Sequence, residues 1–270
     1  MLFSVSNVLG DYVRKRRRAM LHYDVLREQV EGFANAHRDP IRGEFQGDAP
    51  KYVFHIPLEG FDPDWAVLLG EFVYNTRASL DYLITALVRS TGKQENNGNQ
   101  FPIYAFRKDV PWLEMRNWWD AAELVSRQLK NTPPGTRAAL KPLQPFYGIP
   151  ALNPTRHPLA ALNVLSNRDK HRRLNLLARS VLLDFVHADG KPVFQTPPLP
   201  TRIAKGDEGD TQTVTLTVAP DYANVDMYLL APQEVAFHEP PELIGELVET
   251  LTGINEFIDS RVLPTVKSLL

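Results

Sequence analysis

The segment DWAVLLGEFVYNTRASLDYLITALVRST (residues 64–91) decides the fold. Its apolar side chains recur every three or four positions, so they fall within roughly a third of the circumference of an α-helix. A carboxylate at Asp62 or Asp64 can cap the amino end, and Gly92 can end the helix. The segment therefore predicts a long helix with one face in a core. That face is formed by Trp65, Leu69, Phe72, Val73, Leu80, Leu83 and Leu87.

A second helical pattern, rich in leucine, covers residues 158–179 and contains the polar run SNRDKHRR (residues 166–173). At about 100° per residue, Asp169 projects from the same side as Leu162 and Leu165. We therefore expect the carboxylate of Asp169 to point toward a core. A buried acid must find a partner or shift its pKa, so this helix is a candidate for either chemistry or a structural ion network.

The remaining patterns predict an α+β fold. Helical spacing covers residues 6–36, 112–129, 136–146 and 240–263, and strand-like patterns cover residues 43–58, 180–187, 192–195, 212–218 and 225–237. Residues 101–104 read as an extended piece, and residues 197–210 read as an exposed loop. Asp189-Gly190 suits a tight turn that would join the strands on either side as a hairpin.

Helices come first, strands follow, and a last helix returns. This order predicts a helical bundle core with an appended small antiparallel sheet and a carboxyl-terminal helix, rather than alternating βαβ units. We expect one domain over residues 1–270. The one place where a boundary would fall is near residue 180, between a mainly helical part and a β-meander with its closing helix.

The composition excludes several classes of site. The chain has no cysteine, which excludes disulfides, thiol nucleophiles and cysteine-based zinc or iron–sulfur sites. Its histidines lack metal-ligand spacing, and no glycine-rich phosphate loop or G-x-S-x-G elbow is present. We therefore predict no metal and no cofactor. No apolar run approaches the roughly 20 residues that span a bilayer, so we expect a cytoplasmic protein without a membrane partner.

The net charge of -2 gives no global attraction to nucleic acid, so an RNA partner would need a local basic patch. Two runs qualify, RKRRR (residues 14–18) and KHRR (residues 170–173). The first is typical of a solvated helix face. The second fits a solvated face or a phosphate-binding site equally well, because it lies in a leucine-rich context.

The helix over residues 64–91 also carries polar side chains on two flanks. Asn75, Ser79 and Tyr82 fall on one flank, and Arg77 and Asp81 fall on the other. We expect the two groups to serve different neighbours. Arg77 and Asp81 lie one turn apart and can form an ion pair, which stabilises an exposed helix by roughly 0.2–0.5 kcal/mol.

These residues carry a resemblance. The chain from about residue 52 to residue 177 resembles a family of uncharacterised bacterial proteins in which an N-x-R-x-x-L-D-H helix precedes three further motifs. The motifs are an F-P-I segment, an L-Q-P-Y/F stretch and an L-S-N-x-D-K-H-R helix. Their counterparts here are Phe101-Pro102-Ile103, Leu143-Gln144-Pro145-Phe146 and residues 165–172.

A more distant similarity is to HEPN-type helical domains, many of which are metal-independent RNases. Their signature is an arginine followed, after four to six residues, by a histidine on the same helix. The resemblance implies that Arg77 stabilises phosphate charge and that His171 moves a proton. Tyr82 stands where the spacing from Arg77 asks for histidine, and a phenol of pKa near 10 is a poor proton shuttle at neutral pH.

Two hypotheses follow, and whether the protein is an enzyme stays open. In the first, an HEPN-like bacterial protein binds or cleaves RNA in a stress or defence setting, and the resemblance implies a homodimer. In the second, a non-enzymatic interaction protein contains a buried ion network of Arg77, Asp81, Asp169 and Arg173. Besides Arg77 and His171, the candidate binding or orienting residues are Asn75, Asp81, Tyr82, Asn167, Asp169, Lys170, Arg172 and Arg173.

Overall fold

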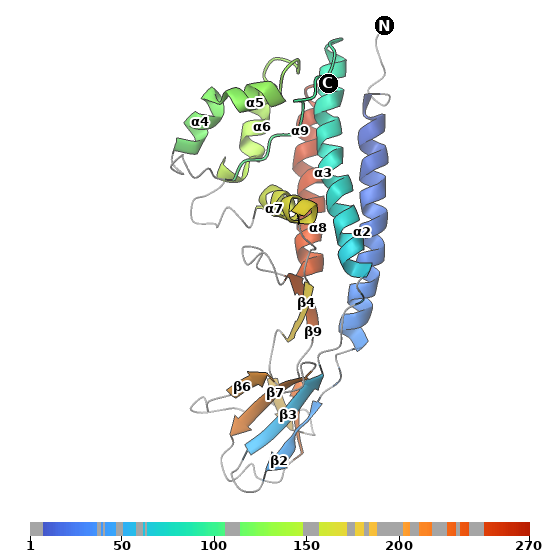
Figure 1. Ribbon diagram of the computed structural model, residues 1–270, viewed down its shortest axis with the longest axis vertical. Helices are drawn as coiled ribbons and strands as arrows, with labels where there is room; N and C mark the ends of the chain where they lie inside the picture. Colours follow the sequence, from blue (N-terminus) through green and yellow to red (C-terminus); the bar gives the residue numbers. More distant parts are fainter. Residues whose placement is uncertain are drawn as a thin grey trace. The chain divides into compact units, whose positions relative to one another are not determined.

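The computed structural model places most of the chain in defined elements (Figure 1). It describes residues 8–270 except 37–38, 40, 47–50, 58–61, 63, 106–113, 148–156, 172–175, 181–183, 188–201, 206–210, 218–225, 231–232 and 238–245. The chain divides into two compact units rather than the single domain expected from the sequence. A helical unit combines Met1–Arg27, Pro63–Asn175 and Phe237–Leu270, and a sheet unit combines Glu28–Asp62 and Leu176–Ala236.

The unit boundary at Asn175 and Leu176 lies close to the predicted one near residue 180, but the division differs. The strands over residues 41–57 belong with the later strands, and the last helix belongs with the earlier helices. Long-range strand pairing produces this arrangement, because β3 (Lys51–Pro57) pairs along its whole length with β7 (Thr211–Thr217). The α+β class is confirmed.

The helical unit is built from α2 to α9. The elements are the first part of α2 (Gly10–Ala36), α3 (Asp64–Ser90), α4 (Met115–Ala121), α5 (Glu123–Gln128), α6 (Thr136–Leu140), α7 (Pro158–His171), α8 (Leu247–Phe257), a π-helical segment (Ile258–Val262) and α9 (Leu263–Lys267). Two 3₁₀ turns, Lys141–Leu143 and Pro145–Tyr147, follow α6. No helix in the described ranges is both long enough and apolar enough to cross a membrane.

The core of this unit surrounds α3, which packs against α7 and α9. All seven apolar residues predicted for the buried face of α3 are buried. The next turn confirms the predicted stop, since Gly92 has a φ of 71°, a conformation that glycine adopts without strain. The periodicity of this one segment therefore defines the centre of the unit.

The closing helix is confirmed, but a π-helical segment interrupts it. Pro264 follows two residues after that segment and cannot donate a hydrogen bond to the carbonyl of Ser260. Its ring also crowds that carbonyl, which favours a wider helical turn just before the proline. The segment Ile258–Val262 thereby presents side chains at angles that a regular α-helix would not give.

The predicted helix over residues 158–179 is too long. α7 ends at His171, and residues Leu176–Ser180 form β4, which is hydrogen-bonded to β9 (Gln233–Phe237). A short apolar run such as Leu176-Leu177 is compatible with helix and strand alike. The distant strand β9 decides the outcome, and nothing local in the sequence indicates this pairing.

The sheet unit contains a four-stranded sheet with the order β2-β3-β7-β6 and a three-stranded sheet with the order β1-β8-β5. The remaining strands are β1 (Ile41–Arg42), β2 (Glu44–Gln46), β5 (Asp184–His187), β6 (Arg202–Lys205) and β8 (Met227–Leu230). The pairings within these two sheets are antiparallel, as predicted. Tyr52 and Phe54 of β3 supply the buried aromatic side chains, and Gly43 is required beside them because a Cβ there would lie 2.7 Å from the Phe54 ring.

Two strand predictions are corrected. The strand at residues 184–187 pairs with β8 rather than with residues 192–195, which lie outside the described residues. Residues 202–205, predicted as loop, form β6 at the edge of the four-stranded sheet. β8 is distant from residues 184–187 in the sequence, so turn chemistry at Asp189-Gly190 gave no guide to that pairing. β6, in contrast, pairs with β7, the next strand along the chain.

His157 links the start of α7 to α8 and makes folding sensitive to acid. Its Nδ1 accepts a hydrogen bond from the amide of Leu159 at 3.2 Å, and its ring meets Phe257 edge-on with centroids 4.7 Å apart. Burial lowers the pKa of His157 from 6.5 to about 4. The neutral ring is therefore favoured in the folded state, and protonation both adds a desolvated charge and removes the cap acceptor.

We predict that the His157 contribution to stability is complete above pH 6.5 and is lost as the pH falls toward 4. His157→Asn keeps a cap acceptor without titrating in this range, so it removes that dependence. Urea unfolding at several pH values measures this. Between pH 6.5 and pH 4 the free energy of unfolding should fall by at most about 3 kcal/mol more for the wild type than for the variant. Parallel pH profiles for the two proteins would contradict the assignment.

Candidate functional site

The predicted pair of Arg77 and Asp81 holds residues 101–104 in place. Arg77 Nη1 donates to Asp81 Oδ1 at 2.6 Å, and Arg77 Nη2 donates to the carbonyl of Phe101 at 2.8 Å. Asp81 Oδ1 in turn accepts from the Phe101 amide at 2.9 Å. The side chain of Arg77 is only 16% exposed. A single ion pair on α3 thus satisfies both the amide and the carbonyl of Phe101, which lies in an irregular segment.

Gln144 holds the same segment from its other side. Its Nε2 donates to the carbonyl of Pro102 at 3.0 Å and to that of Leu140 at 3.3 Å. Its Oε1 accepts from the Tyr104 amide at 3.1 Å, and the residue is fully buried. Residues 101–104 with Arg77, Asp81 and Gln144 are called the 101–104 hub below.

The hub brings together three of the motifs on which the bacterial-family resemblance rests. The Arg77 helix, the Phe101-Pro102-Ile103 segment and the stretch around Gln144 meet through side-chain hydrogen bonds to backbone groups. Buried backbone groups outside regular structure need such partners. The residues of these three motifs therefore hold irregular backbone in place. The guanidinium of Arg77 binds a carbonyl oxygen of the chain itself.

The second polar flank of α3 serves other neighbours, as predicted. Asn75 donates through Nδ2 to the carbonyl of Glu71 at 2.7 Å and accepts from Lys15 Nζ of α2 at 3.3 Å. Ser79 donates to the carbonyl of Thr76 at 2.7 Å. Tyr82 is half-buried, and its hydroxyl has no hydrogen bond to another described residue. Asn75 and Tyr82 therefore do not join Arg77 in one site.

The polar run on α7 is more exposed than predicted. Asp169 lies on the α3 side of α7, where a Cβ at Gly70 would be 2.6 Å from its Oδ1, yet the residue is exposed and Asn167 is exposed as well. The predicted burial of the Asp169 carboxylate is wrong, because α7 ends two residues later and leaves this turn at the edge of the core. Because position 70 is a glycine, the Asp169 carboxylate can lie close to the backbone of α3.

The remaining α7 predictions fall at the limit of what is described. Lys170 and His171 belong to α7, but their side chains lie outside the described part of the structure, as do Arg172 and Arg173. Of the four residues of the predicted interhelical ion network, Arg77 and Asp81 form an ion pair within α3, and the network itself stays a prediction. The role of His171 in proton transfer stays a prediction.

A cluster that the sequence analysis missed joins α2 to the carboxyl-terminal helix. Arg16 Nη1 donates to Asn255 Oδ1 at 2.7 Å, and Nη2 donates to Asp259 Oδ2 at 3.0 Å. Arg16 Nη2 also reaches the Asn255 carbonyl at 3.4 Å, and Nε reaches Asp259 Oδ1 at 3.3 Å. These three residues are called the Arg16 clamp. Burial raises the pKa of the neighbouring Tyr12 to about 12, against the opposing charge of Arg16.

A signal for the clamp was present in the sequence. Arg16 follows Tyr12 by four positions and precedes Ala19 by three, so helical spacing places it on the buried face with them. The sequence analysis missed the buried position of Arg16, because five adjacent cations suggest a solvated helix face. In the structure the run is divided, since Arg16 is 7% exposed and Lys15 lies over the exposed ring of Tyr74.

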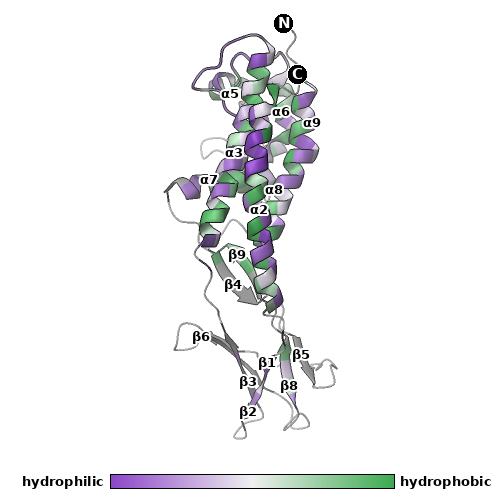
Figure 2. Cartoon of the chain, turned by 90° about the vertical axis from the view of Figure 1, so that its right-hand side faces the viewer, coloured by the Kyte–Doolittle hydropathy of each residue, from purple (hydrophilic) through white to green (hydrophobic). Residues whose placement is uncertain are grey.

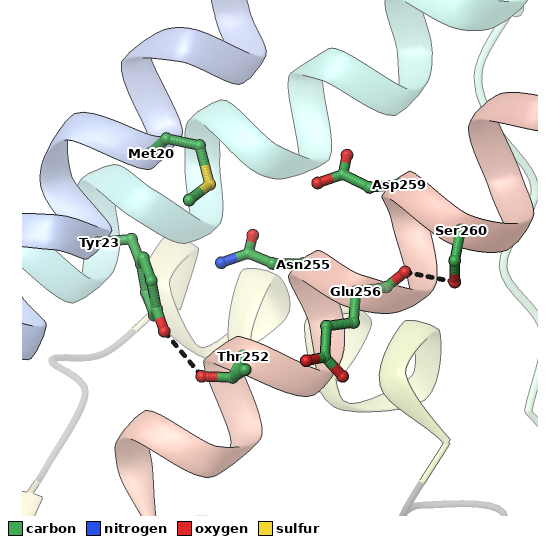
Figure 3. Close-up of a pocket in the computed structure, with 7 residues that line it drawn as sticks. All are labelled: Met20, Tyr23, Thr252, Asn255, Glu256, Asp259 and Ser260. Atoms are coloured by element: carbon green, nitrogen blue, oxygen red, sulfur yellow. Dashed lines mark hydrogen bonds between the residues drawn. The ribbon is translucent and has the colours of Figure 1, made fainter.

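Beside the clamp, α2 and the carboxyl-terminal helix border an open groove of about 620 Å³ (Figure 3). It is called the α8 groove and is lined by Met20, Tyr23, Thr252, Asn255, Glu256, Asp259 and Ser260. The Tyr23 hydroxyl and Thr252 Oγ1 are hydrogen-bonded at 2.7 Å, and Ser260 Oγ donates to the Glu256 carbonyl at 2.6 Å. Two of the lining residues, Asp259 and Ser260, belong to the π-helical segment, a feature that is frequent at functional sites.

The side of α2 opposite the core forms a mixed surface. Val13, Leu21 and Val25 are 56%, 53% and 45% exposed. Figure 2 shows apolar and polar bands alternating along this helix. At about 100° per residue, these residues and the exposed Arg17, Arg18 and Asp24 cover roughly 140° of the helix. The six residues Val13, Arg17, Arg18, Leu21, Asp24 and Val25 are called the outer face of α2.

Metal chemistry has no candidate within the described ranges, where no group of three or more His, Asp and Glu side chains is placed to hold an ion. Two surfaces of the described helical unit are candidates for binding a partner or ligand. They are the α8 groove, with its carboxylates, and the outer face of α2, with its aliphatic and cationic side chains. The hub satisfies polar groups of the helical unit itself, whereas the clamp shares Asn255 and Asp259 with the α8 groove.

We predict that Arg77→Ala lowers the free energy of unfolding by about 1–3 kcal/mol, because it leaves the Phe101 carbonyl without its donor and Asp81 without its cationic partner. Arg89→Ala is the matched control. Arg89 also lies on α3 and has two acidic partners, Asp11 and Glu95, but its side chain is 46% exposed, so its loss should cost less than about 1 kcal/mol. Equal losses in urea unfolding would show that the hub is not a buried framework.

Comparison with known proteins gives no match: no family model, no curated protein and no solved structure is similar to this chain. What the chain does is therefore inferred from its own geometry.

Proposed function

We propose that this chain is a non-enzymatic interaction protein that associates with a second copy of itself through the outer face of α2. The observation that carries the proposal is the exposure of three aliphatic side chains, Val13, Leu21 and Val25, on the helix face opposite the core. Clusters of exposed apolar side chains bordered by charge are typical of protein interfaces.

The charges on this face favour a second copy as the partner. Arg17 and Arg18 come before Leu21 and have no ion pair with another described residue, whereas Asp24 follows Leu21. In an antiparallel pairing centred on Leu21, Arg18 of one copy faces Asp24 of the other, and the same contact repeats by two-fold symmetry. The contact of Asp24 with its own Arg27 is long, at 3.8 Å, and leaves the carboxylate 55% exposed.

The aliphatic residues fit the same arrangement. Leu21 would meet its counterpart at the centre, and the methylene stem of Arg17 would cover Val25 of the partner. Antiparallel helices pack well when apolar residues on one face recur at positions three and four apart or at multiples of a turn, as Val13, Leu21 and Val25 do. In this arrangement the outer face of α2 would bring together opposite charges and apolar side chains of two copies.

The RNase hypothesis has less support. Arg77, which the HEPN resemblance assigns to phosphate, has two of its nitrogens bonded to Asp81 and to the Phe101 carbonyl. The basic run over residues 14–18 is divided among the Arg16 clamp, the Tyr74 ring and an ion pair of Arg14 with Asp11. An acidic residue and three aliphatic ones among the remaining cations suit a protein partner better than a phosphate backbone.

Charge exchange tests the proposed pairing. Arg18→Asp and Asp24→Arg each place like charges opposite one another in a symmetric pair, so each variant alone should be monomeric. When the two variants are mixed, both contacts become attractive again, and a heterodimer should form. Analytical ultracentrifugation of wild type, each variant and the mixture measures this directly, with circular dichroism melting to confirm that the variants fold.

Lys130→Asp is the matched control, because it reverses an exposed charge away from the outer face of α2 and should leave the dimer intact. A monomeric wild type, or variants that stay dimeric, would overturn the proposed pairing. Incubation of labelled RNA with wild type and His171→Ala tests the enzymatic alternative. Cleavage by the wild type that the well-folded variant lacks would overturn the non-enzymatic assignment.

A further inference from the structure

We infer that the α8 groove binds a basic side chain, lysine or arginine, of a peptide segment from a partner protein. The aliphatic stem would lie on Met20 and Tyr23, the cation would lie between the carboxylates of Glu256 and Asp259, and a carbonyl of the peptide would accept from Asn255. This surface is distinct from the outer face of α2, so the inference does not rest on the proposed self-association.

The first support is an unsatisfied donor. Asn255 is only 6% exposed, and its Oδ1 is held by Arg16 at 2.7 Å, which fixes the orientation of its amide. The Nδ2 atom is buried and has no hydrogen-bond partner. Figure 3 shows this nitrogen turned toward the space between Met20 and Tyr23. A buried N–H without an acceptor is costly, and a peptide carbonyl at this position would satisfy it.

The second support is the acidic rim. Glu256 is exposed and has no ion pair with another described side chain. Asp259 receives Arg16 on both oxygens, yet its side chain is 56% exposed, which leaves lone pairs directed at solvent. Two carboxylates on one border of the groove repel phosphate and attract a cation. Figure 3 shows the two carboxylates on the same helix, one on each side of Asn255.

The third support is the opposite wall. Met20 and Tyr23 of α2 provide a thioether and an aromatic ring, and Arg27 already lies 5.4 Å from the centroid of that ring. A methionine side chain adapts its shape readily, so it can move aside and uncover Asn255 Nδ2 as the stem of a lysine or arginine enters. The groove volume of about 620 Å³ is ample for one long side chain and its backbone.

These features together select the ligand class. A free metal ion would not satisfy an N–H donor, and an anion would meet the two carboxylates. A basic residue within a peptide has an aliphatic stem, a cation and a carbonyl acceptor in one unit.

Fluorescence anisotropy with labelled pentapeptides tests the inference on the full-length chain. The probes are Gly-Ala-Arg-Ala-Gly and Gly-Ala-Lys-Ala-Gly, with the citrulline and acetyl-lysine peptides as uncharged controls. We expect saturable binding of a charged peptide and at least about fivefold weaker binding of its uncharged counterpart, which corresponds to the loss of one solvent-exposed ion pair. Glu256→Gln should weaken binding of the charged peptide to a similar extent.

Glu249→Gln is the matched control, because it removes an exposed carboxylate from the same helix without altering the groove lining. Met20→Lys should abolish binding, since the introduced ammonium group would occupy the acidic rim itself. In ¹⁵N-labelled protein the side-chain amide protons of Asn255 should shift downfield on peptide addition, which reports the new acceptor directly.

Absence of saturable binding, equal binding of charged and uncharged peptides, or equal effects of Glu256→Gln and Glu249→Gln would each overturn the inference. An Asn255 amide signal that does not move on saturation would overturn the assigned carbonyl contact. A monomeric wild type that still binds the charged peptide would leave this inference standing while refuting the self-association through α2.

Discussion

The guanidinium of Arg16 is the interaction on which the helical unit depends. It links residues near the start of the chain to Asn255 and Asp259 near its end, across a sequence separation of 239 and 243 positions. Four hydrogen bonds converge on a side chain that is 7% exposed. Because the carboxyl-terminal helix packs on α3 and α7, fixing it to α2 closes the core around the central helix.

The same principle recurs at two other arginines. Arg77 satisfies the backbone of Phe101, and Arg137 donates to the carbonyls of Trp119 and Ala122 while burial lowers its pKa. Arg77 thereby binds irregular backbone, and Arg137 binds carbonyls in the last turn of α4 and at the residue that follows it. Arg77, which suggested phosphate chemistry in the sequence, thus serves as a connection within the fold. These arginines therefore stabilise the fold, and the candidate binding positions lie at the surface.

The sequence predicts elements well where one periodic segment determines its own burial. The whole apolar face of the helix over residues 64–90 and the Arg77–Asp81 pair follow from spacing alone. Predictions fail where a distant partner decides, as at Leu176–Ser180, which is a strand because β9 pairs with it. The Arg16 clamp required knowledge of which helix covers α2, and no local pattern contains that information. The same limit applies to the α8 groove, whose two walls are distant in the sequence.

The clamp also links structure to the surface proposed for recognition. By holding Asn255 Oδ1, Arg16 turns Nδ2 toward the groove, and by binding Asp259 it holds a carboxylate beside that amide. The π-helical segment before Pro264 sets the position of Asp259 on the helix. The fold and the proposed recognition site therefore share one buried cation.

A double-mutant cycle on Arg16→Met and Asp259→Asn, followed by urea unfolding, tests this claim most directly. Each single substitution should lower the free energy of unfolding by about 1–3 kcal/mol, because it leaves a buried or hydrogen-bonded charge without its partner. The double variant should lose at least about 1 kcal/mol less than the sum, and Arg261→Met, on the exposed side of the same segment, should lose almost nothing. Additive losses within about 0.5 kcal/mol would contradict the account, since the two residues would then stabilise the fold independently.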